Sequence, residues 1–337
     1  MTRHISETEQ WLRDNWNKYV SRTELIRGCM ETLGKHHSTV GEMVRRLEKE
    51  TPIKTSIKGL DASHEVQNII QNQEKEISRL KTALDKIGAV RDGRNMELDI
   101  DDNSYSFGLI GDTHIGSLYD RLDDLENFYD ICNNKGITKV LHAGDILDGH
   151  KIYKGQEFEQ YKPGFDAQLN RFVDNYPNGN NIETIFVAGN HDQSFTKLIG
   201  VDVGEAITHK RSDFKFLGND YGTVVFKTPS GRTFDVALHH PGGGSAYAIS
   251  YRPQKIIESL AGGTKPSIIG IGHYHKADLM PSYRNTCSIS VGCFQAQTPF
   301  MVGKSISAHI GGWIIRFTAG TRQTKQNMIE SQFIAYY

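Results

Sequence analysis

Five short apolar segments of this 337-residue chain each end in a cluster of aspartate, asparagine or histidine side chains. One such residue after a strand is usually a local hydrogen-bonded cap, but five clusters in succession are hard to explain in that way. Strand ends in an α/β domain present loops to a common site, so we expect the clusters to form one site. The clusters are Gly111–His114, Gly144–Asp148, Gly189–Asp192, His239–Pro241 and Gly272–His275.

The apolar segments themselves are predicted to be buried strands because each is short, continuous and bounded by glycine or a polar residue. Helical stretches such as residues 121–133 lie between several of them. This alternation predicts an α/β domain over residues 104–337. The predicted strands are residues 107–110, 139–141, 184–188, 235–238 and 268–271.

The chemistry of the clusters points to metal ions. Ligands two residues apart on an extended segment, as in Asp112/His114 and His273/His275, project to the same side. A mixture of carboxylates, imidazoles and one amide suits manganese, iron or zinc better than an all-oxygen magnesium site. A bridging carboxylate can hold two such ions about 3.5–4 Å apart, the spacing used in phosphoryl displacement. Asp145 is the predicted bridge.

The ordered motifs D-x-H, G-D-x-x-D, G-N-H-D, H and G-H-x-H resemble those of the calcineurin-like metallophosphoesterase superfamily, over roughly residues 105–300. The resemblance implies a four-layer α-β-β-α sandwich of two mixed sheets and two divalent ions, manganese with iron and zinc as alternatives. It implies His191 as the catalytic acid. The ligands it implies are Asp112, His114, Asp145 and His275 for one ion and Asp145, Asn190, His239 and His273 for the other. The motif spelling is most similar to Mre11/SbcD-type and archaeal polymerase small-subunit nucleases.

Some residues near the motifs have more than one interpretation. His239 is favoured over His240 as ligand because it is taken to follow the strand directly, which leaves His240 as a neighbour or a substrate contact. Asp148 is expected to orient a ligand, and Asp192 is expected to orient His191. The glycine-rich stretch 241–245 is either a phosphate-contacting loop or a flexible turn. Structural roles are favoured for His142 and His150.

Residues 1–60 are predicted to form a helical, helix-turn-helix-like domain. A first helix is expected over residues 7–20, and a second opens with the Ser21–Glu24 capping box and ends at Gly34. Ser38 and Thr39 are expected to cap a third helix that Pro52 ends. Its outward Arg45, Arg46 and Lys49 are candidate nucleic-acid contacts. The alternative is a helical bundle that serves only packing or protein interaction.

Residues 61–103 are predicted to be a heptad helix and linker. Apolar residues recur at heptad spacing over residues 62–87, which favours a short coiled coil and a homodimer. The alternative is a helix that packs against its own domain.

Composition narrows the function further. The formal net charge of −1 excludes a uniformly basic nucleic-acid coat, although it permits a local basic patch. No apolar run of roughly 18 residues and no signal segment is found, so we expect no membrane contact and a cytoplasmic location. The four scattered cysteines favour incidental thiols over a disulfide framework.

The sequence therefore predicts a metal-dependent phosphoric ester hydrolase that acts by in-line attack of metal-bound hydroxide. A nuclease or phosphodiesterase acting on DNA is the leading hypothesis. The alternative is a phosphatase or phosphodiesterase for a small molecule such as a cyclic nucleotide, with the N-terminal helices used for assembly. A non-catalytic binding protein is disfavoured because no expected ligand is missing.

Overall fold

The computed structural model describes residues 6–50, apart from 17 and 20, and residues 95–337, apart from 179–180, 264 and 321–326. The chain divides into two compact units, Met1–Ala83 and Leu84–Tyr337. The predicted heptad segment 62–87 and Pro52 lie outside the described residues. The division at residues 60/61 and 103/104 stays a prediction, although β1 (Asn95–Asp99) already belongs to a sheet of the second unit.

The first unit holds three helices in its described part, α1 (Glu7–Asn15), α2 (Arg22–Leu33) and α3 (His37–Glu50). The Ser21 hydroxyl accepts a hydrogen bond from the Glu24 amide, as an N-cap should, and Gly34 ends α2 with a φ of +62°. The expected cap of α3 is wrong: the Val40 amide donates to the His36 carbonyl, so Ser38 lies inside the first turn.

These helices bury one apolar face each against a common core. α2 packs on α3, and both contact α1. The predicted helical N-terminal region is confirmed, and its helix-turn-helix-like character stays a prediction. The fully or nearly fully buried residues are Leu12, Trp16, Leu25, Ile26, Cys29, Val40, Val44 and Leu47.

The second unit contains two six-stranded mixed sheets. In the first, β2 (Ser104–Ile110), β3 (Lys139–His142), β4 (Glu183–Ala188) and β5 (Phe214–Asn219) run parallel. Two antiparallel strands, β11 (Gly311–Thr318) and β12 (Met328–Ala335), complete it beside β2. All five predicted strands are confirmed, three of them here.

In the second sheet, β7 (Thr233–His239), β8 (Ile268–Ile271) and β10 (Thr286–Val291) run parallel. β6 (Tyr221–Lys227) is antiparallel to β7 and parallel to β1, and β9 (Ala277–Tyr283) lies at the other edge, antiparallel to β10. β7 and β8 are the other two predicted strands.

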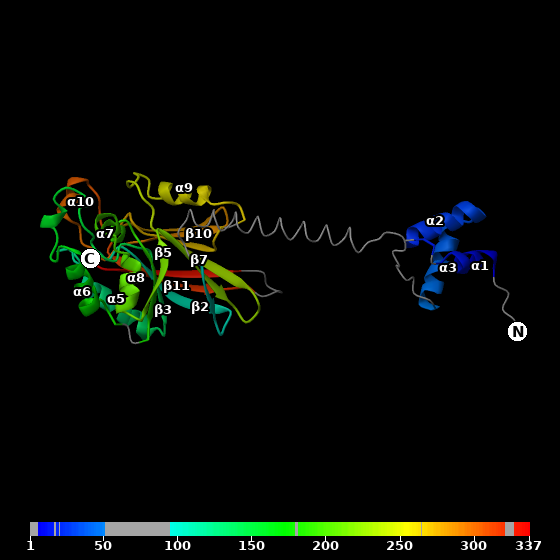
Figure 1. Ribbon diagram of the computed structural model, residues 1–337, viewed down its shortest axis with the longest axis horizontal. Coiled ribbons are helices and arrows are strands. Elements are labelled where there is room, and N and C mark those ends of the chain that lie inside the picture. The colour runs from blue at the N-terminus through cyan, green and yellow to red at the C-terminus, as the bar shows by residue number, and fades with distance from the viewer. Residues whose placement is uncertain are drawn as a thin grey trace. The chain divides into compact units, whose positions relative to one another are not determined.

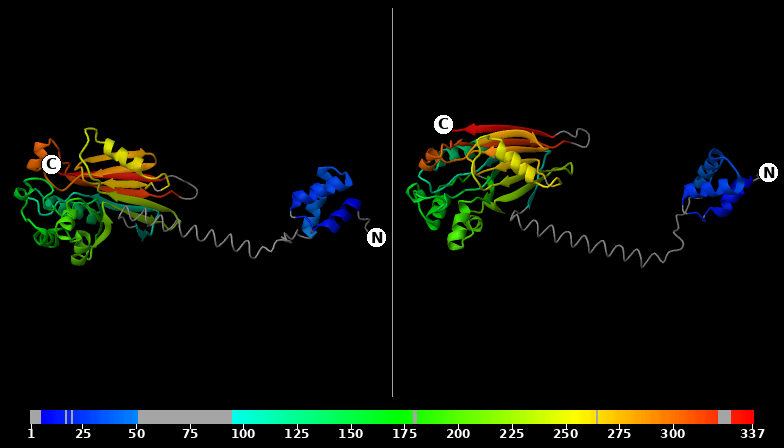
Figure 2. Two further views of the ribbon diagram at one scale, coloured as in Figure 1. Left: turned by 45° about the horizontal axis from the view of Figure 1, so that its top comes forward. Right: turned by 90° about the horizontal axis from the view of Figure 1, so that it is seen from above.

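The two sheets lie face to face with an apolar core between them (Figure 1). On the outer face of the first sheet lie α5 (Leu122–Asn134), α6 (Phe165–Asn175) and α8 (Val203–Lys210), and α9 (Tyr251–Ser259) covers part of the second sheet. Figure 2 shows these layers from two further sides. The predicted four-layer α-β-β-α sandwich is therefore confirmed. No helix in the described ranges is long and apolar enough to cross a bilayer.

Candidate metal centre

The predicted ligands gather where β2, β3, β4, β7 and β8 end, and their backbone conformation there is unusual. Five of them have φ values between +46° and +76°, in the left-handed region that costs residues with a Cβ about 1–3 kcal/mol each. Strain of this kind persists only where the surrounding structure fixes it, and it is typical of functional sites. The five residues are Asp112, His114, Asp145, His273 and His275.

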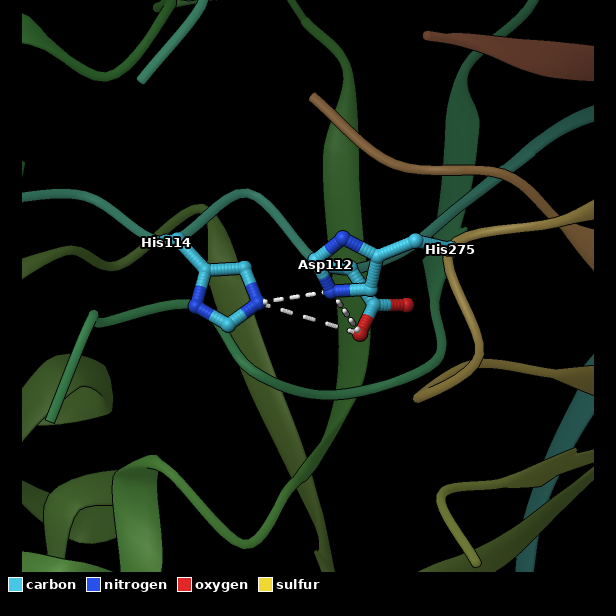
Figure 3. Close-up of side chains that lie close together, drawn as sticks. All are labelled: Asp112, His114 and His275. Atoms are coloured by element: carbon cyan, nitrogen blue, oxygen red, sulfur yellow. Dashed lines mark hydrogen bonds and ion pairs between the residues drawn. The ribbon is translucent and has the colours of Figure 1, made fainter. Parts of the chain in front are cut away.

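A first group of potential ligands comprises Asp112, His114 and His275, all buried (Figure 3). The Nε2 atoms of the two imidazoles lie 3.1 Å apart, and Nε2 of His275 lies 3.4 Å from Oδ1 of Asp112. The Asp112 carboxylate also accepts the His273 amide, which ties the β2 loop to the β8 loop. The three potential ligand atoms therefore lie close enough together to bind one ion.

A second group comprises Asp145, His240 and His273. Nε2 of His240 lies 3.1 Å from Oδ2 of Asp145 and 3.1 Å from Oδ1 of Asn190. The Nδ1 atom of His240 pairs with the Ala143 carbonyl, so in the neutral ring Nδ1 carries the proton and Nε2 is free to bind an ion. In His273 the two ring nitrogens have exchanged roles: Nε2 pairs with the Gly243 carbonyl, and Nδ1 is the nitrogen left for an ion.

His239, the predicted ligand, does not join this group. β7 extends one residue further than expected and includes His239, so it is His240 that follows the strand. The Nδ1 atom of His239 lies 3.0 Å from the Asp220 carbonyl, and its ring packs against Tyr221. The choice of His239 is therefore corrected to His240. The prediction placed the end of the strand one residue too early, and His240 as the ligand is a proposal.

Asp145 lies between the two groups, as expected of a bridge. Its Oδ2 atom is 3.9 Å from Nε2 of His114 and 3.1 Å from Nε2 of His240. Its Oδ1 atom accepts the His191 amide at 2.8 Å. This close approach requires glycine at position 189, where a Cβ would lie 2.1 Å from the carboxylate.

The charges in this region favour a cation. Burial by itself raises the pKa of Asp145, but the surrounding imidazoles, His240 foremost, hold that pKa well below its usual range. Burial likewise opposes a proton on His240, yet the nearby carboxylates, Asp145 foremost, raise its pKa to about 9. A site that binds a proton this firmly also suits a metal ion, which takes the same lone pairs and displaces the proton.

The donor set fits the two divalent ions implied by the sequence. The ligand atoms of each group lie within 4.8 Å of one another, and imidazole combines with carboxylate in both. Asp112, His114, His275 and Asp145 would hold one ion, and Asp145, Asn190, His240 and His273 the other. Those assignments stay a proposal.

His191 lies beside the ligands and is oriented by backbone. Its Nδ1 atom is 2.6 Å from the Asp148 carbonyl, and its Nε2 atom is 4.0 Å from Oδ2 of Asp145. Its ring meets that of His114 edge to face, with centroids 4.5 Å apart. The Nε2 atom is therefore the one that faces the site.

Asp192 has a different role from the expected one. Its carboxylate accepts the amides of Ile146, Leu147 and Gly189, and its bonds within the described ranges run to these amides and not to the His191 ring. Burial first, and Asp145 second, raise the pKa of Asp192 to about 7. Asp192 thus holds the β3 and β4 loops together, and its expected action on His191 is corrected to a structural role.

Asp148 is held by three buried glutamines that sequence reasoning did not predict. Gln156, Gln160 and Gln295 each donate a side-chain N–H to its carboxylate. Its Oδ1 atom lies 3.4 Å from Nδ1 of His114, so the expected orienting role has a geometric basis. Gln156 and Gln160 follow Asp148 by 8 and 12 residues and Gln295 by 147, and no motif in the sequence predicts that their side chains converge.

His142 is structural, as expected. Its Nδ1 accepts the Gly144 amide, so its Nε2 carries the proton and donates to the Thr113 hydroxyl. Complete burial lowers the pKa of His142 to about 3. The ring therefore stays neutral and links the β2 and β3 loops.

Comparison with known proteins agrees with this geometry. The model of the family described as calcineurin-like phosphoesterase matches residues 105–277, slightly more than half of the chain. The chain belongs to the calcineurin-like phosphoesterase family.

A curated relative of this phosphoesterase chain is the DNA polymerase II small subunit of Methanocaldococcus jannaschii, 26% identical over 256 residues. The match covers 62% of the chain and only 41% of the relative. Similar solved structures include zinc-bound Vps29 from Entamoeba histolytica (14% identity, TM-score 0.32, covering 68% of the chain and 98% of that protein). A predicted phosphoesterase from Streptococcus pneumoniae gives 12% identity, TM-score 0.33 and coverage of 68% and 98%.

The potential ligands of the phosphoesterase unit open onto a cavity of about 290 Å³. His114, Asp145, Asn190, His191, His273 and His275 all line it. Another part of its lining is apolar and comes from the loop after β3 and from α10 (Pro299–Gly303). There the Tyr153 and Phe300 rings stack 4.2 Å apart at an interplanar angle of 17°. One cavity thus combines potential metal ligands with a flat aromatic surface.

The predicted nucleic-acid residues lie on α3 in the other unit. Arg45, Arg46 and Lys49 are exposed or partly exposed. Arg46 also pairs with the carboxylate of Glu9, a nearly buried residue of α1. Arg46 therefore has a structural partner, whereas the described structure gives Arg45 and Lys49 no carboxylate partner.

Proposed function

We propose that this chain is a nuclease or phosphodiesterase acting on DNA, dependent on two divalent ions, with manganese the first candidate. The observation that carries the proposal is the single cavity that joins the ligand groups to the stacked Tyr153 and Phe300 rings. A phosphate on the ions would leave an attached nucleobase beside a flat aromatic surface, on which any base can stack.

Bound ions would supply an activated nucleophile and neutralise charge on the phosphate. The side chains prepare the site for this. The Asp145 carboxylate belongs to the second ligand group and lies 3.9 Å from His114 of the first, and Asp148 lies 3.4 Å from the other nitrogen of the His114 ring. The strained loops fix the ligand atoms in advance, so little reorganisation is needed when the ions and the substrate bind.

His191 is the proposed acid. Because its Nδ1 pairs with the Asp148 carbonyl, the proton for the leaving group would be carried by Nε2, the atom that faces the site. From there it can be donated to the leaving oxygen as the phosphorus–oxygen bond breaks. The side chain is 14% exposed, so it can exchange its proton with water between turnovers.

The polymerase small subunit supports DNA as the polymer, since the name of that relative links it to DNA synthesis. The chain spans only 41% of that protein, so its substrate is a proposal here. The N-terminal helical unit, with Arg45 and Lys49 on α3, gives a second reason to consider duplex DNA.

The second candidate is a phosphatase or phosphodiesterase for a small molecule such as a cyclic nucleotide. The volume of the cavity favours it, because about 290 Å³ is near the lower end of ordinary small-molecule sites. In that case the N-terminal helices and the predicted heptad segment 62–87 serve assembly, which sedimentation of the full chain would test.

A substrate panel distinguishes the two candidates. The protein is incubated with manganese and plasmid DNA, short single strands, a chromogenic phosphate monoester or a cyclic nucleotide. Hydrolysis of DNA at far higher kcat/KM than the cyclic nucleotide or monoester supports the nuclease, and the reverse order overturns it. Asp145→Asn, purified in parallel, is the control for contaminating enzymes, since a neutral amide bridges two cations poorly.

A further inference from the structure

A second cavity, of about 190 Å³, lies next to the metal centre and is lined by basic side chains. Arg252 from α9, Lys276 and His309 all line it, and none of the described residues that line it is an aspartate or glutamate. It shares Ser245 and Tyr274 with the larger cavity. The two cavities are therefore neighbours with part of their lining in common.

The segment after β8, which carries two of the proposed metal ligands, lines both cavities. His273 and His275 line the larger cavity, and Lys276 lines the smaller one. The Arg252 guanidinium lies beside Gly243, since a Cβ built on that glycine would be 3.5 Å from Nη2 of Arg252. The Gly243 carbonyl in turn pairs with Nε2 of His273. The cationic groups are thus one residue or one loop away from the proposed ligands.

These cationic groups lack the anionic partners that similar side chains have elsewhere. Arg171 and Arg211, also partly buried, each bind an aspartate through two nitrogens. Among the described residues, Arg252 has no ion pair, and its buried Nε has no hydrogen-bond partner. Within the described part of the chain, the Lys276 ammonium donates only to Ser307, an uncharged partner. A partly buried guanidinium with an unused donor indicates that an anion belongs in this cavity.

His309 adds a directed neutral donor. Its Nδ1 accepts the Ala277 amide at 3.1 Å, so the ring proton is on Nε2. Guanidinium, ammonium and an imidazole N–H form a donor set suited to the several acceptor oxygens of a phosphate group.

We infer that the basic cavity, defined by Arg252, Lys276 and His309, is a subsite for a second phosphate, the neighbouring phosphate of a polynucleotide whose scissile phosphate lies at the metal centre. This inference rests on the proposed function and names its substrate class. The cavity suits a polynucleotide because the two phosphates of one strand are joined by a nucleoside, and the aromatic pair in the larger cavity accepts a base.

The first test is kinetic and uses two substrates that differ by one phosphate linkage, the thymidine dinucleotide TpT and the trinucleotide TpTpT. The wild-type protein should prefer the trinucleotide. In Arg252→Gln the ratio of kcat/KM for the trinucleotide to that for the dinucleotide should fall roughly 10-fold or more, the effect of losing a hydrogen bond to a charged group. Arg252→Lys should recover part of the ratio, and Lys276→Gln should lower it as well.

The matched control is Lys255→Gln, which removes the same charge from α9 at an exposed position that pairs with Glu258. It should keep the wild-type ratio. Equal losses on both substrates in Arg252→Gln would overturn the subsite. Thymidine diphosphate and thymidine monophosphate are compared in the same way. If Arg252 raises kcat/KM for the diphosphate over the monophosphate but not for the trinucleotide over the dinucleotide, the polynucleotide assignment is wrong.

The second test does not depend on turnover. A fluorescein-labelled thymidine oligonucleotide is titrated with protein in EDTA, and anisotropy gives the affinity at several salt concentrations. Arg252→Gln should bind more weakly, with a salt slope smaller by about 0.7 for each single-strand phosphate that is no longer neutralised. Unchanged affinity and slope would refute the subsite even if the enzyme hydrolyses DNA, and a reduced slope would support it even if no hydrolysis is found.

Discussion

Nε2 of His240 lies 3.1 Å from Oδ2 of Asp145, whereas the adjacent His239 lies within β7 and faces Asp220 and Tyr221. Two consecutive histidines thus have different surroundings: His240 is a candidate ligand, and His239 is a residue of the strand. The two histidines form a matched pair for mutagenesis, because both variants remove the same side chain from the same strand end.

His240→Ala should lose the ion held by the second ligand group and most of the activity, whereas His239→Ala should retain both metal content and activity. Loss of a hydrogen-bonded partner outside the ligands already costs about 10–100-fold in metal affinity or activity, so loss of a ligand should cost at least that much. Metal content is measured by elemental analysis after dialysis. Two ions retained by His240→Ala would refute the corrected assignment.

His191→Ala should reduce turnover more than metal content, because the proposed acid is not among the assigned ligands. The expected loss is on the order of 10²–10⁴-fold for substrates with an alkoxide leaving group. It should be smaller for a nitrophenyl ester, whose leaving group needs no proton. The comparison uses single-turnover rates on both esters, and equal losses would argue against the acid role.

The buried ring of His142 should make the free energy of unfolding depend on pH. The unfolded chain binds a proton there below about pH 6.5, but the folded chain binds one only below about pH 3. Between these values the unfolded state holds more protons, so stability falls as pH falls, by about 1.4 kcal/mol per pH unit. His142→Gln should flatten that slope by one proton in urea titrations at pH 4, 5 and 6 with EDTA. Identical slopes would contradict the prediction.

The sequence predicted the fold and most of the centre because both depend on local patterns. Apolar runs that end in residues such as Asp112 or His273 predicted the five strands, whereas the four-layer sandwich was implied by the family resemblance of the motifs. The choice between His239 and His240 failed because it depended on one residue of strand length. The contact of Gln295 with Asp148 and the basic cavity at Arg252 depend on segments that are distant in the sequence, which no local pattern encodes.

The charges on α3 provide the test of the N-terminal unit. Arg45→Gln combined with Lys49→Gln removes two charges and leaves the Arg46–Glu9 ion pair intact, so the helical core should be preserved. If this helix contacts duplex DNA, affinity should fall uniformly across sequences, and the slope of log affinity against log salt should shrink by about 0.9 for each phosphate that is no longer neutralised. Lys18→Gln, outside α3, is the control for charge within the same unit. Anisotropy with a labelled duplex gives both quantities, and hydrolysis of a chromogenic diester in the same samples checks the metal centre. An unchanged affinity and slope would make the helical unit an assembly element, and the case for duplex DNA would then depend on the phosphoesterase unit alone.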